Sequence, residues 1–331
     1  MSSTAKFKSW ISAARLRTLP LSISGIIMGS SCAYLIGSSP IYLSIDTLNP
    51  TIFDPSFKVE VLCIGLLGLI TTLCFQILSN FANDYGDGVK GTDNDKRIGP
   101  TRAVQSGHIS SSQMKTAIIV TAIISFISAI SLIIMSLGLD QLLIALVFLA
   151  LGILAIWAAI KYTVGDDAYG YSGLGDLFVF IFFGPVSVMG IYFLILKTLN
   201  VFLILPSLTI GLLSVAVLNL NNMRDVENDK FSGKNTLVVK VGLKRARIFH
   251  IAILAIAFIC AYLYASHLYL FLDKITRLIY LPLIAFIPIV IHSIKVVRNK
   301  VPALFDPELK KVALSTFLYS LLFVGITIYF T

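Results

Sequence analysis

Long apolar runs alternate with short polar segments along nearly the whole chain of 331 residues. A helix that crosses a hydrocarbon core of about 30 Å needs about 20 apolar residues. We therefore predict nine transmembrane helices, near residues 18–37, 61–83, 116–138, 140–160, 174–196, 201–221, 248–270, 277–297 and 312–330. The pattern predicts an all-α polytopic membrane protein in which these helices form one bundle and residues 1–331 form a single domain.

The composition identifies the solvent of this bundle. Hydrophobic residues make up 57% of the chain and charged residues only 13%, whereas about 25% of the residues in a soluble domain are charged. So few charges would leave the surface of a water-soluble globule of this size largely uncovered. We expect a lipid bilayer to surround most of the surface, and nothing in the sequence indicates a nucleic-acid-binding module.

The basic residues fall mainly on one side of the predicted membrane. With the N-terminus in the cytoplasm, 22 of the 26 Lys and Arg residues lie in cytoplasmic segments. Because cytoplasmic loops carry an excess of Lys and Arg, we predict this orientation, which places the C-terminus outside. The longest outer segment, about 38–60, contains three prolines and is predicted to be a surface loop of unknown role.

The polar chemistry concentrates at two predicted helix ends on the cytoplasmic side. At 100° per residue, each end presents one amide and two carboxylates within an arc of about 80° or less. The residues are Asn80, Asp84 and Asp87 after the second apolar run, and Asn221, Asp225 and Asp229 after the sixth. The two sets form an internal repeat whose copies run in the same direction through the membrane.

Two matched acidic helix ends indicate a metal site. Neighbouring carboxylates on a helix repel each other, and charge is costly at the edge of the hydrocarbon region. Mg²⁺, or Mn²⁺ in its place, prefers carboxylate oxygens and keeps coordination sites for water and substrate phosphates. We therefore predict a metal pair around one diphosphate. The alternative is an acidic face that is simply solvated.

Basic and hydroxyl-bearing residues follow each acidic end and are suited to phosphate oxygens. After the first end come Lys90, Lys96, Arg97 and Arg102. After the second end comes the turn Gly233-Lys234-Asn235-Thr236. This turn lacks the spacing of a Walker A loop, which disfavours a nucleotide-driven pump. The alternative for each basic residue is the ordinary Lys and Arg content of a cytoplasmic loop.

Several longer strings carry a family resemblance. They are ARLRTLP (Ala14–Pro20), NDYGDGVKGTD (Asn83–Asp93), RIGP (Arg97–Pro100), YGYSGLGD (Tyr169–Asp176), FGPVSVMG (Phe183–Gly190) and NNMRDVENDKFSGKNTLVVKVG (Asn221–Gly242). With the nine apolar runs, the chain resembles the UbiA-type intramembrane prenyltransferase superfamily, and within it the branch that prenylates 1,4-dihydroxy-2-naphthoate. The chain departs from this pattern at Gly88, where many relatives carry a third acid, and at Asp166 and Asp167, in a loop that is usually rich in Gly and Pro.

The resemblance implies a reaction and a place in the cell. A polyprenyl group would pass from polyprenyl diphosphate to 1,4-dihydroxy-2-naphthoate, with Mg²⁺ required and CO₂ lost, giving demethylmenaquinone. The enzyme would lie in the bacterial plasma membrane with its active site at the cytoplasmic side. The prenyl tail would need no built tunnel if it left sideways into the bilayer.

The resemblance also implies roles for individual residues. The metal ligands would be Asp84, Asp87, Asp225 and Asp229, aided by Asn80 and Asn221, which would also lie near the diphosphate. The cations for the diphosphate would be Arg102, Lys161 and Lys234. Tyr162 or Tyr171 would stabilise the allylic cation through a ring face or a hydroxyl. Arg15 or Arg17, together with Tyr171, would bind the acceptor, because a planar guanidinium suits its carboxylate.

Other functions remain open at this point. A different acceptor, 4-hydroxybenzoate or homogentisate, would use the same acidic ends. A transporter for a divalent cation or an organic anion is disfavoured because the acids lie at helix ends rather than at mid-span. A lipid synthase acting on CDP-alcohols would need several Asp residues in one short helix segment. For Arg15 and Arg17, the alternative is anchoring at the cytoplasmic face.

The predicted orientation can be measured. A cysteine placed at Thr331 should react with a membrane-impermeant reagent added outside, because nine spans bring the C-terminus to that side. A cysteine in the 90–96 loop should react only when the cytoplasmic side is opened. Labelling of both positions from one side would mean that the number of spans differs from nine by an odd number.

Overall fold

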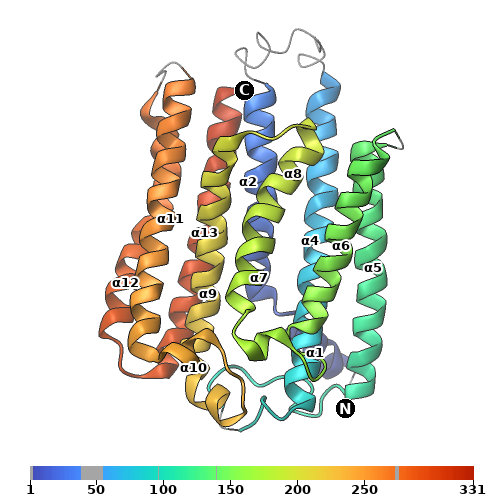
Figure 1. Ribbon diagram of the computed structural model, residues 1–331, viewed down its shortest axis with the longest axis vertical. Helices are drawn as coiled ribbons and strands as arrows, with labels where there is room; N and C mark the ends of the chain where they lie inside the picture. Colours follow the sequence, from blue (N-terminus) through green and yellow to red (C-terminus); the bar gives the residue numbers. More distant parts are fainter. Residues whose placement is uncertain (1–2, 39–54, 96, 139, 273–275) are drawn as a thin grey trace.

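Helices form the whole framework of the protein (Figure 1). The computed structural model describes residues 3–38, 55–95, 97–138, 140–272 and 276–331. Within these ranges no strand is present, and nine helical segments are long and apolar enough to cross a membrane, which confirms the predicted fold. The segments are Lys6–Gly37, Ser56–Val89, Ser111–Leu137, Leu142–Lys161, Gly175–Leu196, Val201–Phe231, Leu243–Phe271, Arg277–Arg298 and Pro302–Phe330.

Most spans contain one long helix, and two are composite. The long helices are α2 (Leu19–Gly37), α4 (Pro55–Val89), α5 (Ser111–Leu137), α6 (Leu142–Lys161), α9 (Ile204–Phe231), α11 (Leu243–Phe271) and α13 (Phe305–Phe330). The composite spans are α7 (Gly175–Ile181) with α8 (Ser187–Leu196), and a 3₁₀ segment (Arg277–Phe286) with α12 (Ile287–Arg298). Two short helices, α1 (Ser3–Ala14) and α10 (Leu237–Val241), lie at one end of the bundle (Figure 1).

The helices are longer than the apolar runs that predicted them. The prediction ended two of them near residues 83 and 221, but α4 continues to Val89 and α9 to Phe231. Hydropathy detects only the part of a helix that needs lipid, so it misses polar turns that stay helical. Both acidic motifs therefore lie in regular helix. Most of the predicted 38–60 loop, residues 39–54, lies outside the described residues, and the rest begins α4 at Pro55.

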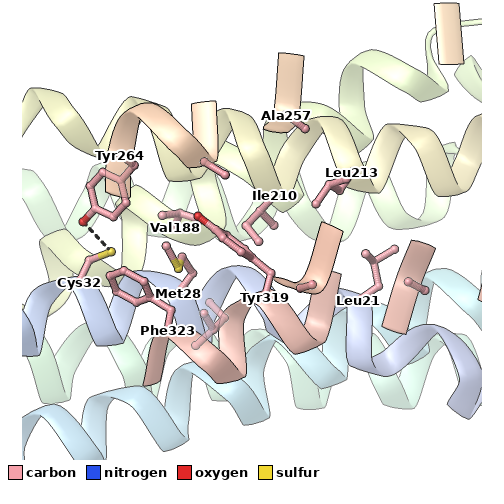
Figure 2. Packing of buried hydrophobic residues seen from close by; sticks show 14 of the residues in the cluster. Leu21, Met28, Cys32, Val188, Ile210, Leu213, Ala257, Tyr264, Tyr319 and Phe323 are labelled. Carbon is pink, nitrogen blue, oxygen red and sulfur yellow. Dashed lines mark hydrogen bonds between the residues drawn. The ribbon is translucent and has the colours of Figure 1, made fainter. Parts of the chain in front are cut away.

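The core is formed where α2, α8, α9, α11 and α13 meet (Figure 2). Met28 of α2, Val188 of α8 and Ile210 of α9 are fully buried there. The hydroxyl of Tyr264 on α11 donates to the sulfur of Cys32 at 3.1 Å, which satisfies a polar group in the apolar interior. This packing holds the helices that carry the polar end of the bundle.

Small residues let α2 approach α8 closely. A Cβ atom at Gly29 would lie 2.3 Å from the backbone oxygen of Val188, a contact that no side chain tolerates. Helices in lipid associate through such close packing, because lipid tails supply no hydrophobic drive between helices. The α2–α8 contact therefore depends on glycine at this position.

The α7–α8 span bends at a single π-helical turn, Phe182–Val186. Pro185 in this turn has no backbone N–H to donate, and a π turn absorbs the missing bond. The bend separates α7 from α8 within one span.

The polar loops gather at the end of the bundle where the chain begins, and the C-terminus lies at the opposite end (Figure 1). This end includes the segments 90–110, 162–174 and 232–242. Helix α1 is attached to it through Trp10, whose ring packs edge-on against Phe81 of α4 at 5.6 Å. The segments predicted to be cytoplasmic therefore lie together.

Candidate active site

One large cavity of about 360 Å³ opens inside the bundle near this polar end. Helices α2, α4, α5, α6, α7, α8 and α9 all contribute to its wall. Most of the residues predicted for the site line it: Arg15, Arg17, Asn80, Asp87, Arg102, Tyr162, Asn221, Asp225, Asp229 and Lys234. Three predicted residues, Asp84, Lys161 and Tyr171, are not part of its lining.

On α4, the side chain of Asp87 faces the cavity and is already bonded. Its carboxylate accepts a hydrogen bond from the hydroxyl of Tyr171 at 2.7 Å and pairs with the ammonium of Lys234 at 3.1 Å. Asn80, two turns earlier, donates to the backbone oxygen of Ala14 at 2.8 Å. This α4 face therefore joins the start of the chain to the turn after α9.

Asp84 lies at the edge of this helix face and turns toward a loop. Its two oxygens accept the backbone N–H groups of Ala103 and Val104, at 3.1 and 3.0 Å. The predicted arc held Asp84 together with Asp87, but the cavity stripe of α4 runs through Asn80 and Asn83 instead. The present bonds assign Asp84 the anchoring of the loop, and its place as a metal ligand stays a prediction.

On α9, Asp225 is held by Arg224, which is almost completely buried. The guanidinium donates to both carboxylate oxygens, with distances of 2.9 and 2.6 Å. It also donates to the side-chain oxygen of Asn221 at 2.8 Å and to Asp306 at the start of α13. Arg224 thus links the second acidic motif to the last helix of the chain.

Asp229, one turn further along α9, is in a different electrostatic situation. It is 5% exposed and lines the cavity, yet none of the described residues forms a hydrogen bond or ion pair with its carboxylate. A buried carboxylate without a partner is costly. The ammonium of Lys234 interacts with Asp229 electrostatically without forming an ion pair, and a further cation beside Asp229 would stabilise its carboxylate.

A fourth carboxylate of the cavity wall, that of Asp93, belongs to the same polar end. It is buried, lines the cavity, and pairs with Arg97 at 3.1 Å and Arg102 at 3.9 Å. Arg97 also reaches Asp225 at 3.6 Å. Burial and repulsion by Asp87 raise the pKa of Asp93, although the two guanidinium groups oppose this change.

Five basic side chains line the cavity against four carboxylates. Burial lowers the pKa of Arg102 well below its usual value, and the neighbouring charges of Arg15 and Arg97 lower it further. Arg102 lines the cavity, and its Nε atom is buried without a hydrogen-bond partner. A cluster of cations with this shortage of negative charge is suited to an anion.

The two predicted acceptor arginines differ in their partners. Arg17 pairs with Asp306 at 3.6 Å. The Nε and Nη2 atoms of Arg15 are buried and have no hydrogen-bond partner. The backbone of Arg15 is in the left-handed region at φ 52°, which is uncommon for a residue other than glycine. This turn between α1 and α2 carries an unsatisfied guanidinium to the cavity wall.

Lys234 and the tyrosines complete the wall. Burial opposes the charge of Lys234, yet Asp87 and Asp229 hold the pKa of its ammonium above its usual value. Its Nζ atom lies 5.1 Å from the ring centre of Tyr171 and 6.0 Å from that of Tyr162. Tyr162 presents its ring to the cavity, whereas Tyr171 supports Asp87 from behind.

The two acids that depart from the family pattern, Asp166 and Asp167, are exposed to solvent. They are not part of the cavity wall. This placement agrees with a solvated loop.

The donor types in the cavity suit a divalent metal, although no three His, Cys, Asp or Glu side chains among the described residues lie close enough together to form a metal cluster. The carboxylates of Asp87, Asp225 and Asp229 line the same cavity, and that of Asp229 has no hydrogen bond or ion pair with a described residue. Carboxylate oxygens are the ligands that Mg²⁺ and Mn²⁺ prefer.

Sequence reasoning missed two residues of this wall, Asn83 and Asp93, and named Arg97 only among the basic residues suited to phosphate. Asn83 and Asp93 begin and end a string that carried the resemblance, Asn83–Asp93. Considering every polar residue of that string would have identified both candidates. No sequence motif pointed to Asp306, because only the packing of α13 in the folded chain brings it to Arg224 and Arg17.

The fold and the cavity define a polytopic membrane enzyme with an acid-rich site, and the chain belongs to the UbiA prenyltransferase family, which residues 53–306 match. Members of this family generally use a divalent metal. The chain is 39% identical over 318 residues to a 1,4-dihydroxy-2-naphthoate octaprenyltransferase of Haemophilus influenzae, covering 96% of this chain and 95% of that protein. It is 43% identical over 260 residues to the Escherichia coli protein of the same name, covering 78% and 77%.

A solved structure supports the fold independently. The structure of a digeranylgeranylglyceryl phosphate synthase in membranes aligns with 98% of this chain and 99% of its own, with a TM-score of 0.53. The two sequences are 18% identical, so this likeness concerns the fold alone.

The bonds of Asp84 lead to a measurable outcome. Asp84→Ala leaves the amides of Ala103 and Val104 without acceptors, and hydrogen exchange at both should rise roughly 5- to 150-fold, as the loss of about 1–3 kcal/mol would produce. Asp229→Ala is the matched control, since Asp229 bonds neither amide, and it should leave both exchange rates unchanged. Unaltered exchange in Asp84→Ala would show that other contacts hold the loop.

Proposed function

We propose that the protein transfers a polyprenyl group from polyprenyl diphosphate to 1,4-dihydroxy-2-naphthoate, with loss of CO₂ and release of diphosphate, to give the quinol form of demethylmenaquinone. One observation carries the proposal. A single cavity holds an unpartnered carboxylate, Asp229, and an unpartnered guanidinium, Arg15, and it continues into an apolar interior. These features suit a metal-bound diphosphate, an aromatic carboxylate and an isoprenoid chain, and the names of the bacterial relatives agree with these substrates.

The proposed metal is Mg²⁺, with Mn²⁺ as a substitute. Its ligands would come from the cavity-lining carboxylates, helped by the two amides of the acidic motifs: Asp87, Asp225, Asp229, Asn80 and Asn221. The metal, when bound, supplies positive charge that stabilises the leaving diphosphate. For Asp84 to join these ligands, it would have to release two backbone amides.

The diphosphate is proposed to lie against the cations of the same wall. Arg102 has a buried, unpartnered Nε atom, and Arg97 and Lys234 stand on either side of the acids. As the allylic C–O bond breaks, negative charge grows on the departing oxygen, and fixed cations stabilise it without reorganising. Lys161 remains a weaker candidate because it does not line the cavity.

The allylic cation is proposed to form beside aromatic rings and away from water. Tyr162 lines the cavity, and its ring packs edge-on against that of Tyr169 at 5.4 Å. The face of an aromatic ring attracts a cation, more strongly where water is excluded. Tyr171 is not part of the wall, so its predicted role beside the acceptor is replaced in this proposal by support of Asp87.

The acceptor is proposed to bind through its carboxylate to Arg15. The guanidinium has buried N–H groups without partners, so a planar carboxylate would satisfy them. With the acceptor held, a C–C bond forms between the prenyl carbon and the ring, and the ring then loses its carboxylate as CO₂. Arg17 already has Asp306 as its partner, which leaves it less suited to this role.

We also propose that this multi-pass protein lies in the bacterial plasma membrane with the site at the cytoplasmic face. Two observations support this orientation. The loops rich in Lys and Arg surround the site, and the C-terminus lies at the far end of the bundle (Figure 1). Both substrates would then enter from the cytoplasmic leaflet.

Removal of the metal or of its ligand gives the first test. Excess EDTA should abolish transfer, and added Mg²⁺ should restore it. Asp229→Asn should lower kcat by at least about 10²-fold, as the loss of charge stabilisation in the transition state does. Glu227→Gln, an exposed position on the same helix, is the matched control and should leave kcat unchanged. Full turnover in excess EDTA would exclude a metal-dependent mechanism.

The acceptor assignment gives the second test. Arg15→Gln removes a charge-assisted contact of about 1.5–3 kcal/mol, so the KM for dihydroxynaphthoate should rise roughly 10- to 150-fold. The KM for the prenyl diphosphate should hardly change, and Arg17→Gln is the comparison variant with a smaller expected effect on the acceptor. Assays with labelled carboxylate should show CO₂ release. A preference for 4-hydroxybenzoate without CO₂ release would overturn the acceptor but not the metal site.

A further inference from the structure

Helices α11, α12 and α13 meet at the polar end of the bundle, outside the cavity (Figure 1). Among the described residues, α11 and α12 contribute nothing to the cavity wall, and α13 contributes Leu309 alone. Direct bonds join the three helix ends. Arg247 on α11 donates through Nη2 to the backbone oxygen of Asn299, which follows α12. His292 on α12 forms a hydrogen bond of 2.9 Å with Glu308 on α13.

Basic side chains crowd these three helix ends. Residues 243–247 and 295–311 contain eight Lys and Arg residues but only two acids. We call the eight cations the basic rim, and they are Lys244, Arg245, Arg247, Lys295, Arg298, Lys300, Lys310 and Lys311.

The two acids of these segments already have partners. Asp306 is bound to Arg224, and the buried carboxylate of Glu308 pairs with Lys311. Neither is left to neutralise the rest of the basic rim. No described residue forms an ion pair or a side-chain hydrogen bond with the cations of five rim residues, which are Lys244, Arg245, Arg298, Lys300 and Lys310. The rim therefore carries positive charge that the described residues do not balance.

Two N–H donors at the junction of α11 and α12 also lack an acceptor. The Nε atom of Arg247 and the Nδ2 atom of Asn299 are buried and have no hydrogen-bond partner among the described residues. Other atoms of the same two residues are engaged, since Oδ1 of Asn299 accepts the backbone N–H of Val301 at 2.9 Å. A buried donor without an acceptor is costly. The junction is thus short of acceptors as well as of negative charge.

Exposed apolar side chains lie beside these cations. Ile248 on α11 is 64% exposed, Val297 on α12 is 58% exposed, and Leu304, just before α13, is 56% exposed. All three belong to the ends of segments that are long and apolar enough to cross a membrane. Apolar side chains at such ends stay in hydrocarbon, while long basic side chains beside them extend to the headgroups. The anions at that level of a membrane are lipid phosphates.

We propose that the basic rim binds the phosphate headgroup of an anionic phospholipid, whose tails lie against the exposed apolar faces of α11 and α12. The site lies outside the cavity, so this inference does not depend on the proposed function. A bound headgroup would hold the ends of three helices together, and one of these helices carries Asp306, the partner of Arg224.

Removal of rim charge tests the site. The triple variant Arg245→Gln/Arg298→Gln/Lys300→Gln changes side chains that bond to no other described residue, so the fold should persist. Native mass spectrometry of the purified protein in detergent should show that its affinity for phosphatidylglycerol falls roughly 10- to 150-fold, because each cation near the headgroups favours binding. Its affinity for phosphatidylcholine, which has no net charge, should hardly change.

A matched variant separates the site from the net charge of the protein. Lys6→Gln/Lys8→Gln/Lys115→Gln removes the same charge from exposed positions on α1 and α5, across the same end of the bundle (Figure 1). This variant should keep the affinity for phosphatidylglycerol of the unmodified protein. Added salt should weaken phosphatidylglycerol binding to the unmodified protein more than to the rim variant, because salt screens exposed charges.

A second rim variant keeps the test available if the first does not fold. Lys244→Gln/Lys310→Gln neutralises two other exposed rim cations and should also weaken phosphatidylglycerol binding, by a smaller factor. Equal affinity of the unmodified protein for the two lipids, or equal losses in the rim variant and the matched variant, would overturn the proposal. Displacement of the lipid by an equal concentration of glycerol phosphate, which has no tails, would also overturn it, since the site would then take a soluble anion.

Discussion

Mutual neutralisation of buried charge at one end of an apolar bundle is the constraint on which the rest of the structure depends. Isolated charges at this depth are costly, and they become tolerable when they are paired and hydrogen-bonded. Arg224 therefore sits between Asp225 and Asp306, and Asp93 between Arg97 and Arg102. Only Asp229 and Arg15 lack such partners among the described residues that line the cavity. This pairing of charges thus leaves two groups for ligands.

Much of this could be predicted from the sequence, because the apolar runs and the helical period are local properties. The nine spans and the shared face of Asn221, Asp225 and Asp229 follow from them. The groups that a helix face contacts depend on tertiary packing, which the local sequence pattern does not determine. The helical period places Asp84 on the same face as Asp87. Only the folded chain shows that two loop amides already donate hydrogen bonds to Asp84.

The same cavity has a charged part and an apolar part, and a prenyl diphosphate carries a charged head and an apolar tail. Its charged end suits a diphosphate, and apolar side chains such as Phe75 and Leu194 line the rest of its wall. This continuity was not visible in the sequence, since cavity-lining residues such as Ile133 and Leu151 are indistinguishable from lipid-facing ones in the same runs.

The tie between Arg224 and Asp306 has a consequence for how the protein is made. Asp306 opens α13, whereas Arg224 belongs to α9, which is synthesised three spans earlier. Until α13 arrives, Arg224 has only Asp225 as its acidic partner, and Arg17 waits for the same carboxylate. A nascent chain cut short before α13 therefore cannot complete the charge balance around its acids, so the site closes only after α13 has been made.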